Sequence, residues 1–179
     1  RHYYNVLGMI FAYAEKQGLI AVNPMLRVDA PKKDKKPIDA LTAKQAQQLF
    51  SFLSEAPLDF QCAMQLLLTA GLRRGECLGL KWKDLDEAGS TITIERSVVY
   101  TPNSGVIIST PKTADSIRTI PVMPHMLSLL LRLKQQVKQT YPHVILNDAF
   151  IFPIGTNIFQ PRNPTTFTRR VKRFIKDCG

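Results

Sequence analysis

The fold of this chain is decided by residues 69–82, which read T-A-G-L-R-R-G-E-C-L-G-L-K-W. An apolar run leads into Gly71, a residue that can adopt a positive φ and so end a helix or make a sharp turn. An arginine beside a buried wall needs an anion, which Glu76 or a bound phosphate can supply. Because Glu76 lies three residues after Arg73, the two side chains share a face of one helical turn. The stretch predicts either an ordinary ion pair at a helix end or an anion-binding site. Four apolar residues are expected to bury this turn against a core: Leu72, Leu78, Leu80 and Trp82.

The charge of the chain favours a polyanion as partner. Its 179 residues include 24 Lys and Arg against 14 Asp and Glu, a formal net charge of +10. A cationic surface gains affinity by releasing counterions from a phosphate backbone, but charge alone does not separate DNA from RNA or an anionic membrane. With 45% apolar residues the chain can bury a core. No apolar run approaches the roughly 20 residues that span a bilayer, and no signal peptide is recognisable.

The three cysteines argue against a disulfide or zinc framework. Cys62, Cys77 and Cys178 are odd in number, far apart and without C-x-x-C spacing. They are typical of reduced thiols, which predicts a cytoplasmic protein.

The N-terminal part predicts a helix and then a basic linker. Apolar residues recur at helical spacing over residues 3–17, Gly18 ends that helix, and Asn23-Pro24 ends the segment that follows. One helix cannot bury its own apolar face, so residues 1–26 look like the end of another domain. Residues 27–40 carry a cluster of cations between prolines, which fits a solvated hinge as well as a DNA contact. These cations include Lys32, Lys33, Lys35 and Lys36.

A second domain is predicted from residue 41 onward. Thr42 and Gln45 form a T-x-x-Q capping box before a helix, and residues 58–70 form a second helix that leads to Arg73. Three carboxylates then fall within residues 84–87. They cannot all converge on one ion, and a solvated turn is favoured over a metal site.

The hydrophobic period then changes from helical to alternating. Residues 91–95, 98–100, 106–108 and 116–121 predict the strands of one small antiparallel sheet, with Lys112 at a loop tip. Two further helices are predicted, one beginning at Met123-Pro124 and the other at Asn163-Pro164. His125 is interpreted as a solvated residue near a cap. The last helix carries Arg169, Arg170 and Arg173, which suit either a phosphate-facing surface or a solvated face.

Two motifs together resemble the tyrosine recombinases, the phage integrase family. The run T-A-G-L-R-R-G-E-C-L-G-L-K-W-K-D-L resembles the first conserved box of that family. By this resemblance Arg73 binds the scissile phosphate, Glu76 supports it and Arg74 is a variable neighbour. P-K-T followed by R-x-I-P-V resembles the hairpin whose lysine reaches the minor groove, which makes Lys112 the residue that protonates the departing 5′-hydroxyl.

The resemblance implies a fold and a division of the chain. The fold would be mixed α/β (α+β), mainly helical, with the integrase-like catalytic domain and a small antiparallel β-sheet or hairpin. Residues 1–26 would be the C-terminal helix of a core-binding (SAM-like) domain, 27–40 a basic linker, and 41–179 the first two-thirds of a catalytic domain.

The resemblance also implies partners. These are double-stranded DNA at an attachment or recombination site and other protomers of the same protein on that DNA, without membrane, metal or cofactor. The residues expected to contact DNA are Lys32, Lys33, Lys35, Lys36, Thr113, Arg118, Arg169, Arg170 and Arg173.

Two parts of the family's site do not occur in this sequence. No histidine is followed by an arginine three residues later, and the tyrosines, at positions 3, 4, 13, 100 and 141, all precede the point where the H-x-x-R box should begin. We therefore expect these residues alone to bind DNA without cutting it, while the full-length protein would act as a recombinase. A non-catalytic DNA-binding protein or decayed recombinase is the alternative, and a basic RNA-binding domain is a third possibility.

Overall fold

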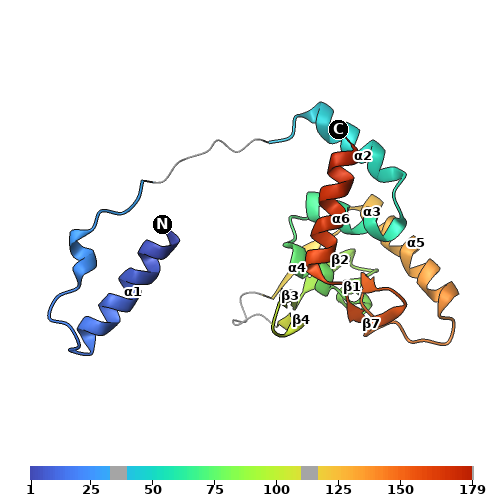
Figure 1. Cartoon of the computed structure of the whole chain (residues 1–179). Helices are drawn as coiled ribbons and strands as arrows, with labels where there is room; N and C mark the ends of the chain where they lie inside the picture. The colour runs from blue at the N-terminus through green and yellow to red at the C-terminus, as the bar shows by residue number, and fades with distance from the viewer. Residues whose placement is uncertain (33–39, 110–116, 179) are drawn as a thin grey trace. The chain divides into compact units, whose positions relative to one another are not determined.

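The computed structural model describes residues 1–32, 40–109 and 117–178. They fall into two compact units, Arg1–Leu41 and Thr42–Gly179 (Figure 1). The elements are mainly helical, as the sequence predicts, and the strands of the second unit are antiparallel. In the described part of the chain, no helix is long and apolar enough to cross a bilayer.

The first unit contains helix α1 (His2–Lys16) and the 3-10 helix η1 (Pro24–Arg27). Gly18 follows α1 with a φ of 70°, as expected of a helix stop. The turn that follows Gly18 ends at Asn23-Pro24, and these residues also begin η1, which was not predicted. The Asn23 side chain accepts a hydrogen bond from the Met25 backbone N–H at 2.9 Å, and proline fits the first helical position. None of the residues of α1 is buried in this unit.

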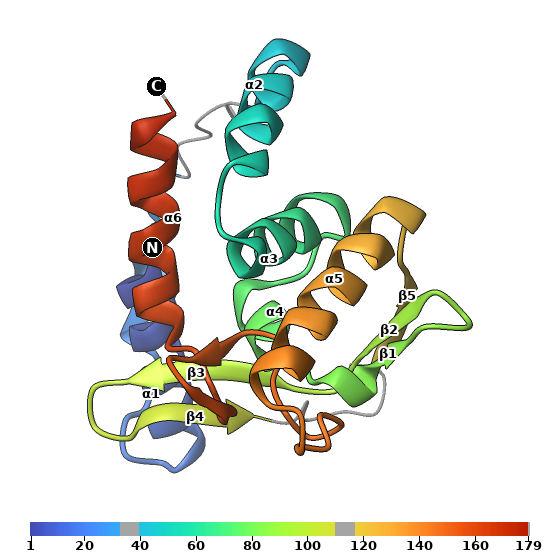
Figure 2. The same ribbon diagram turned by 90° about the vertical axis from the view of Figure 1, so that its right-hand side faces the viewer.

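The helices of the second unit surround its core. They are α2 (Ala43–Ser54), α3 (Leu58–Thr69), α4 (Arg74–Gly79), α5 (Pro124–Thr140) and α6 (Pro164–Asp177). The predicted Thr42 capping box is confirmed, since Thr42 and Gln45 exchange hydrogen bonds at the start of α2. Figure 2 shows α3 and α5 side by side, with α6 along another side of α3. Their apolar faces meet in a core that includes Phe60, Leu66, Leu130 and Phe167.

The sequence predicts one small sheet, but the strands form separate small sheets. Strands β1 (Leu85–Asp86), β2 (Thr91–Ile94) and β5 (Arg118–Pro121) are antiparallel in the order β1-β2-β5. Strands β3 (Ser97–Thr101) and β4 (Gly105–Ser109) form a separate hairpin. The break falls at residues 95–96, where the Arg96 side chain turns inward to the Asp84 carboxylate. A further hairpin, β6 (Pro153–Ile154) with β7 (Asn157–Pro161), was not predicted.

The carboxylates at residues 84–87 do not all belong to a solvated turn. Asp86 and Glu87 are exposed, and Asp86 accepts backbone N–H groups of the turn that follows. Asp84, however, is only 5% exposed and accepts the Lys81 N–H at 2.7 Å as well as the Arg96 guanidinium. The solvated-turn interpretation is therefore wrong for Asp84, which is a buried structural acid. Among the described residues no cluster of His, Cys, Asp or Glu is suited to a metal ion.

Candidate functional site

The turn between α3 and α4 presents Arg73 at the surface. Helix α3 ends at Thr69, and Gly71 turns the chain with a φ of 62°, which residues with a side chain rarely adopt. The predicted apolar anchors are all buried, at 5% exposure for Leu72 and at most 1% for Leu78, Leu80 and Trp82. Arg73 is therefore the N-cap residue of α4 on a backbone fixed from both sides.

Gly75 sets how closely α4 approaches the β3–β4 hairpin. A β-carbon built on Gly75 would lie 2.6 Å from the carbonyl oxygen of Val98, closer than real contacts allow. Val98 is itself buried in β3. The second glycine of the G-L-R-R-G motif thus has a packing reason, because only a residue without a side chain lets the helix start rest on the strand.

The carboxylate of Glu76 receives two arginines. Arg73 contacts it twice, through its backbone N–H to Oε2 and through Nη1 to Oε1, both at 2.9 Å. Arg118, at the start of β5, donates from Nη1 to Oε1 at 3.1 Å and from Nη2 to Oε2 at 2.7 Å. The Glu76 side chain is only 8% exposed, so these bonds satisfy a charge that water scarcely reaches.

The electrostatics of this cluster favour an ionised Glu76. Hydrogen bonding from Arg118, more than either single bond from Arg73, lowers the pKa of the Glu76 carboxyl from its ordinary 4.5 to about 2, although burial opposes the shift. Two guanidiniums around one carboxylate leave a net positive charge. That charge is open to solvent on Arg73, whose side chain is 82% exposed, whereas that of Arg118 is 37% exposed.

The ion pair between Arg73 and Glu76, one of the two alternatives that the sequence predicts, is therefore present. It uses only part of the hydrogen-bonding capacity of Arg73. One Nη1–H bond ties the guanidinium to Glu76, and the rest of its surface remains available to an anion. The contact between Glu76 and Arg118 was not foreseen, since Arg118 was placed among the DNA-contacting residues. No local sequence signal indicates this contact, because it forms only when the pairing of Arg118 with Ile94 brings β5 into the sheet.

Several predicted site residues lie outside the described part of the chain. These are Lys33, Lys35 and Lys36 of the linker, and Lys112 and Thr113. Lys32, at the edge of the described linker, is exposed, as are Arg169 and Arg173 on α6. Arg74, the neighbour of Arg73, donates from Nη1 to the Thr168 hydroxyl at 2.6 Å and so links α4 to α6.

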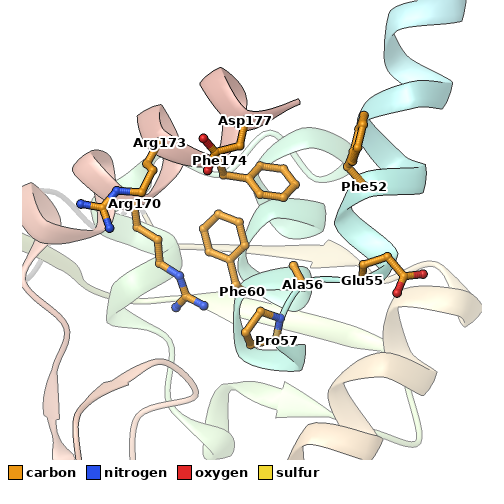
Figure 3. Close-up of a pocket in the computed structure, with 9 residues that line it drawn as sticks. All are labelled: Phe52, Glu55, Ala56, Pro57, Phe60, Arg170, Arg173, Phe174 and Asp177. Carbon is orange, nitrogen blue, oxygen red and sulfur yellow. The ribbon is translucent and has the colours of Figure 1, made fainter. Parts of the chain in front are cut away.

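Arg170 faces the protein more than solvent. Its guanidinium donates to the Asp59 carboxylate at 3.2 Å and lies over the Phe60 ring, 4.4 Å from the ring centroid. Figure 3 shows Arg170 and Phe60 at one side of a surface cavity of about 420 Å³ between α6 and the α2–α3 corner. Phe174 also lines the cavity and makes an edge-on contact with Phe60, with ring centroids 5.2 Å apart. The geometry therefore ties Arg170 to helix packing, while Arg173, also on the cavity wall, remains exposed.

Comparison with known sequences places this arrangement in a family. The sequence model of the phage integrase family matches residues 39–179. The ICEBs1 integrase of Bacillus subtilis (strain 168) is 26% identical over 174 residues, which cover 96% of this chain and 46% of that protein. The integrase of Mycobacterium phage L5 is 28% identical over 181 residues, covering 100% of this chain and 46% of its own length. The chain thus spans about half the length of these relatives.

Solved structures share the fold. An integrase of the Tn1549 transposon, in complex with a circular intermediate DNA, superposes with a TM-score of 0.78 at 26% identity, covering 98% of this chain and 58% of that one. A lambda integrase dimer bound to a core site has a TM-score of 0.60 at 21% identity, covering 98% of this chain and 44% of that one. The second match shows likeness of fold alone.

Proposed function

Because this chain belongs to the phage integrase family of tyrosine recombinases, we propose that it forms part of the site that cuts and rejoins DNA in site-specific recombination. In this reaction a tyrosine hydroxyl attacks a DNA phosphodiester, a 3′-phosphotyrosyl bond forms, and the 5′-hydroxyl leaves. Attack by a 5′-hydroxyl on that bond then rejoins a strand and releases the tyrosine. No metal or other cofactor enters the proposal.

Each proposed catalytic residue has a distinct task. Arg73 donates to the non-bridging oxygens of the scissile phosphate, where negative charge builds up in the pentacoordinate transition state. Glu76 holds Arg73, and Lys112 gives a proton to the departing 5′-oxygen. The observation that carries the proposal is the placement of Arg73. The Arg73 side chain is 82% exposed, while its backbone N–H and its Nη1 are held by Glu76, whose side chain is 8% exposed.

Double-stranded DNA is the proposed partner. The net charge of +10 suits a phosphate backbone, and the related Tn1549 integrase is known in complex with DNA. We propose that the linker lysines 32, 33, 35 and 36, with Thr113, Arg169 and Arg173, contribute contacts that give affinity without base recognition. Arg170 and Arg118 are not included in this set, because they form ion pairs within the protein, with Asp59 and Glu76 respectively. Other protomers of the protein on the same DNA are proposed as further partners.

The same proposal assigns a role to each segment of the chain. Residues 1–26 would close a core-binding domain, 27–40 would run along DNA as a basic linker, and 41–179 would supply Arg73 and Lys112 to the catalytic domain. The second arginine box and the nucleophilic tyrosine are not among these 179 residues. We therefore expect the chain by itself to bind DNA without forming a covalent bond to it.

The covalent step tests the proposal through two adjacent arginines. The measurement is the rate at which the full-length protein forms a denaturant-resistant adduct with a nicked duplex that carries its recombination site. Arg73→Ala should lower that rate by roughly 10²–10³, the loss expected when one transition-state donor is removed. Arg74→Ala removes the same charge from the next position, and it should leave the rate near that of the unchanged protein. Equal rates for the two variants would refute the role of Arg73.

DNA binding by the chain alone is tested with a fluorescent duplex of mixed sequence. Affinity should fall linearly on a logarithmic salt scale, with a slope of about −0.9 for each phosphate neutralised. A matched RNA duplex as competitor tests the hypothesis that the chain is an RNA-binding domain. Stronger binding to RNA, or an adduct between DNA and this chain alone, would contradict the proposal. Sequencing the native reading frame beyond codon 179 separates a recombinase from a non-catalytic DNA binder.

A further inference from the structure

The guanidinium of Arg118 contacts a carboxylate within the protein. Both of its terminal nitrogens donate to Glu76, Nη1 to Oε1 at 3.1 Å and Nη2 to Oε2 at 2.7 Å. Such a two-point contact fixes the plane of the carboxylate as well as its position, because the guanidinium fork matches the spacing of the two oxygens. The same two oxygens hold Arg73, through its backbone N–H and its Nη1.

The backbone of Arg118 is fixed by the β-sheet. Arg118 begins β5 and pairs in register with Ile94 of β2, which is only 1% exposed. Glu76, by contrast, stands in the first turn of the short helix α4, and its residue is 6% exposed. The ion pair therefore joins two elements that are 42 residues apart in sequence, and it couples the helix that carries Arg73 to a strand of the core sheet.

We propose that Arg118 is a positioning residue that holds Glu76 and thereby keeps Arg73 oriented toward the phosphate, with its positive charge only partly offset by Glu76. Two consequences of the geometry support this assignment. The two-point contact holds the carboxylate in the plane in which it meets Arg73. It also shares the negative charge of Glu76 between two guanidiniums, so that Arg73 is not neutralised by its own partner. The inference rests on the proposed role of Arg73 and replaces the expectation that Arg118 itself binds DNA.

Two properties distinguish this role from a DNA contact. A residue that binds a backbone phosphate contributes to affinity, so its loss weakens binding on all sequences and reduces the salt slope by about 1. A positioning residue instead affects the rate of the bound complex. Arg118→Gln should therefore lower the adduct-forming rate at saturating DNA by roughly tenfold to a hundredfold, the scale of a misplaced catalytic group. The dissociation constant and the salt slope should stay as they are.

The variants are matched to separate charge from geometry. Arg118→Lys keeps the charge but not the fork, so its rate should lie between those of Arg118→Gln and the unchanged protein. Arg132→Gln removes one exposed cation from α5 and serves as the control for net charge. In the 179-residue chain that carries the same substitution, the emission of Trp82, its single tryptophan, verifies that each variant folds before the rates of the full-length variants are compared.

An independent measurement uses the chain alone and needs no activity. The carboxyl carbon of Glu76 can be titrated by NMR in the unchanged chain, in Arg118→Gln and in Arg73→Gln. The inference expects the larger upward change in the midpoint for Arg118→Gln. A larger change for Arg73→Gln would overturn it, because Arg118 would then not be the main holder of the carboxylate.

The outcomes in the full-length protein separate this inference from the proposed function. If Arg73→Ala impairs the adduct and Arg118→Gln does not, only the positioning role is overturned. If Arg118→Gln weakens binding and flattens the salt slope without changing the rate of the bound complex, Arg118 is a DNA contact and the inference is wrong. If Arg73→Ala itself leaves the rate unchanged, the proposed function fails, and the positioning role falls with it.

Discussion

Replacing Glu76 with glutamine should destabilise the second unit in a way that depends on pH. The exchange keeps the shape of the side chain but removes the charge that Arg73 and Arg118 meet. A pKa lowered from 4.5 to about 2 corresponds to about 3 kcal/mol of preference for the ionised form in the folded state. Since the side chain of Arg73 is 82% exposed, screening by water reduces this contribution. We expect Glu76→Gln to lower the free energy of unfolding by on the order of 2 kcal/mol at neutral pH.

The pH dependence provides the sharper test. A carboxyl whose folded-state pKa is depressed contributes its full stability above the ordinary pKa, and loses it as the pH falls toward the folded value. The difference in free energy of unfolding between the unchanged chain and Glu76→Gln should therefore be constant above about pH 5. It should narrow between pH 4.5 and about 2, where Glu76 takes up a proton.

Urea unfolding followed through Trp82, the single tryptophan, measures this difference at each pH. Glu55→Gln removes an exposed carboxylate at the end of α2 and controls for the loss of one negative charge. A difference that is absent at neutral pH, or one that does not change in acid, would refute the reasoning, because the contacts with Arg73 and Arg118 would then carry no net stability.

Two further predictions concern packing and the thiols. Gly75→Ala should destabilise the chain by about 1–3 kcal/mol in urea, because its β-carbon would lie 2.6 Å from the Val98 carbonyl oxygen, whereas Gly8→Ala, with open space around it, should not. In a thiol assay the folded chain should react through Cys178 first, because Cys62 and Cys77 are buried. Burial also raises the pKa of both buried thiols, that of Cys62 to about 12. Fast reaction of all three cysteines without denaturant would contradict the buried placement.

Local signals in the sequence predicted most of the helices of the second unit. Thr42 and Gln45 form the capping box that their spacing indicates, and Asn163 accepts backbone N–H groups at the start of α6. These features depend on residues a few positions apart, so they can be read from the sequence alone. The buried turn around Arg73 was predictable for the same reason, since its apolar anchors and Gly71 lie within a dozen residues.

What the sequence did not predict depends on contacts between distant residues. The break between the sheets coincides with the ion pair of Arg96 with Asp84, and nothing in the alternation of residues 91–95 signals it. The β6–β7 hairpin is short, and its turn at Gly155, with a φ of 53°, was not recognised. The ion pair of Glu76 with Arg118 joins residues 42 positions apart, so it becomes visible only when the sheet brings β5 beside α4.

The two buried acids among the described residues of the second unit have similar local geometry but different surroundings. Glu76 and Asp84 each accept the backbone N–H of the residue three positions earlier, and each also accepts an arginine from a later segment. The Asp84 pair is closed, since the Arg96 side chain is only 10% exposed, and burial raises the pKa of Asp84.

The Glu76 cluster is open on one side. It has a second arginine, and the side chain of that residue, Arg73, is 82% exposed. The same motif of an acid held by a backbone N–H and an arginine therefore serves two purposes in one unit. At Asp84, where Arg96 is the one arginine that contacts the acid among the described residues, the motif fixes a corner of the chain. Where a surplus guanidinium reaches the surface, a fixed positive charge becomes available to an anion from outside, and that surplus is what marks the α3–α4 turn as the candidate site.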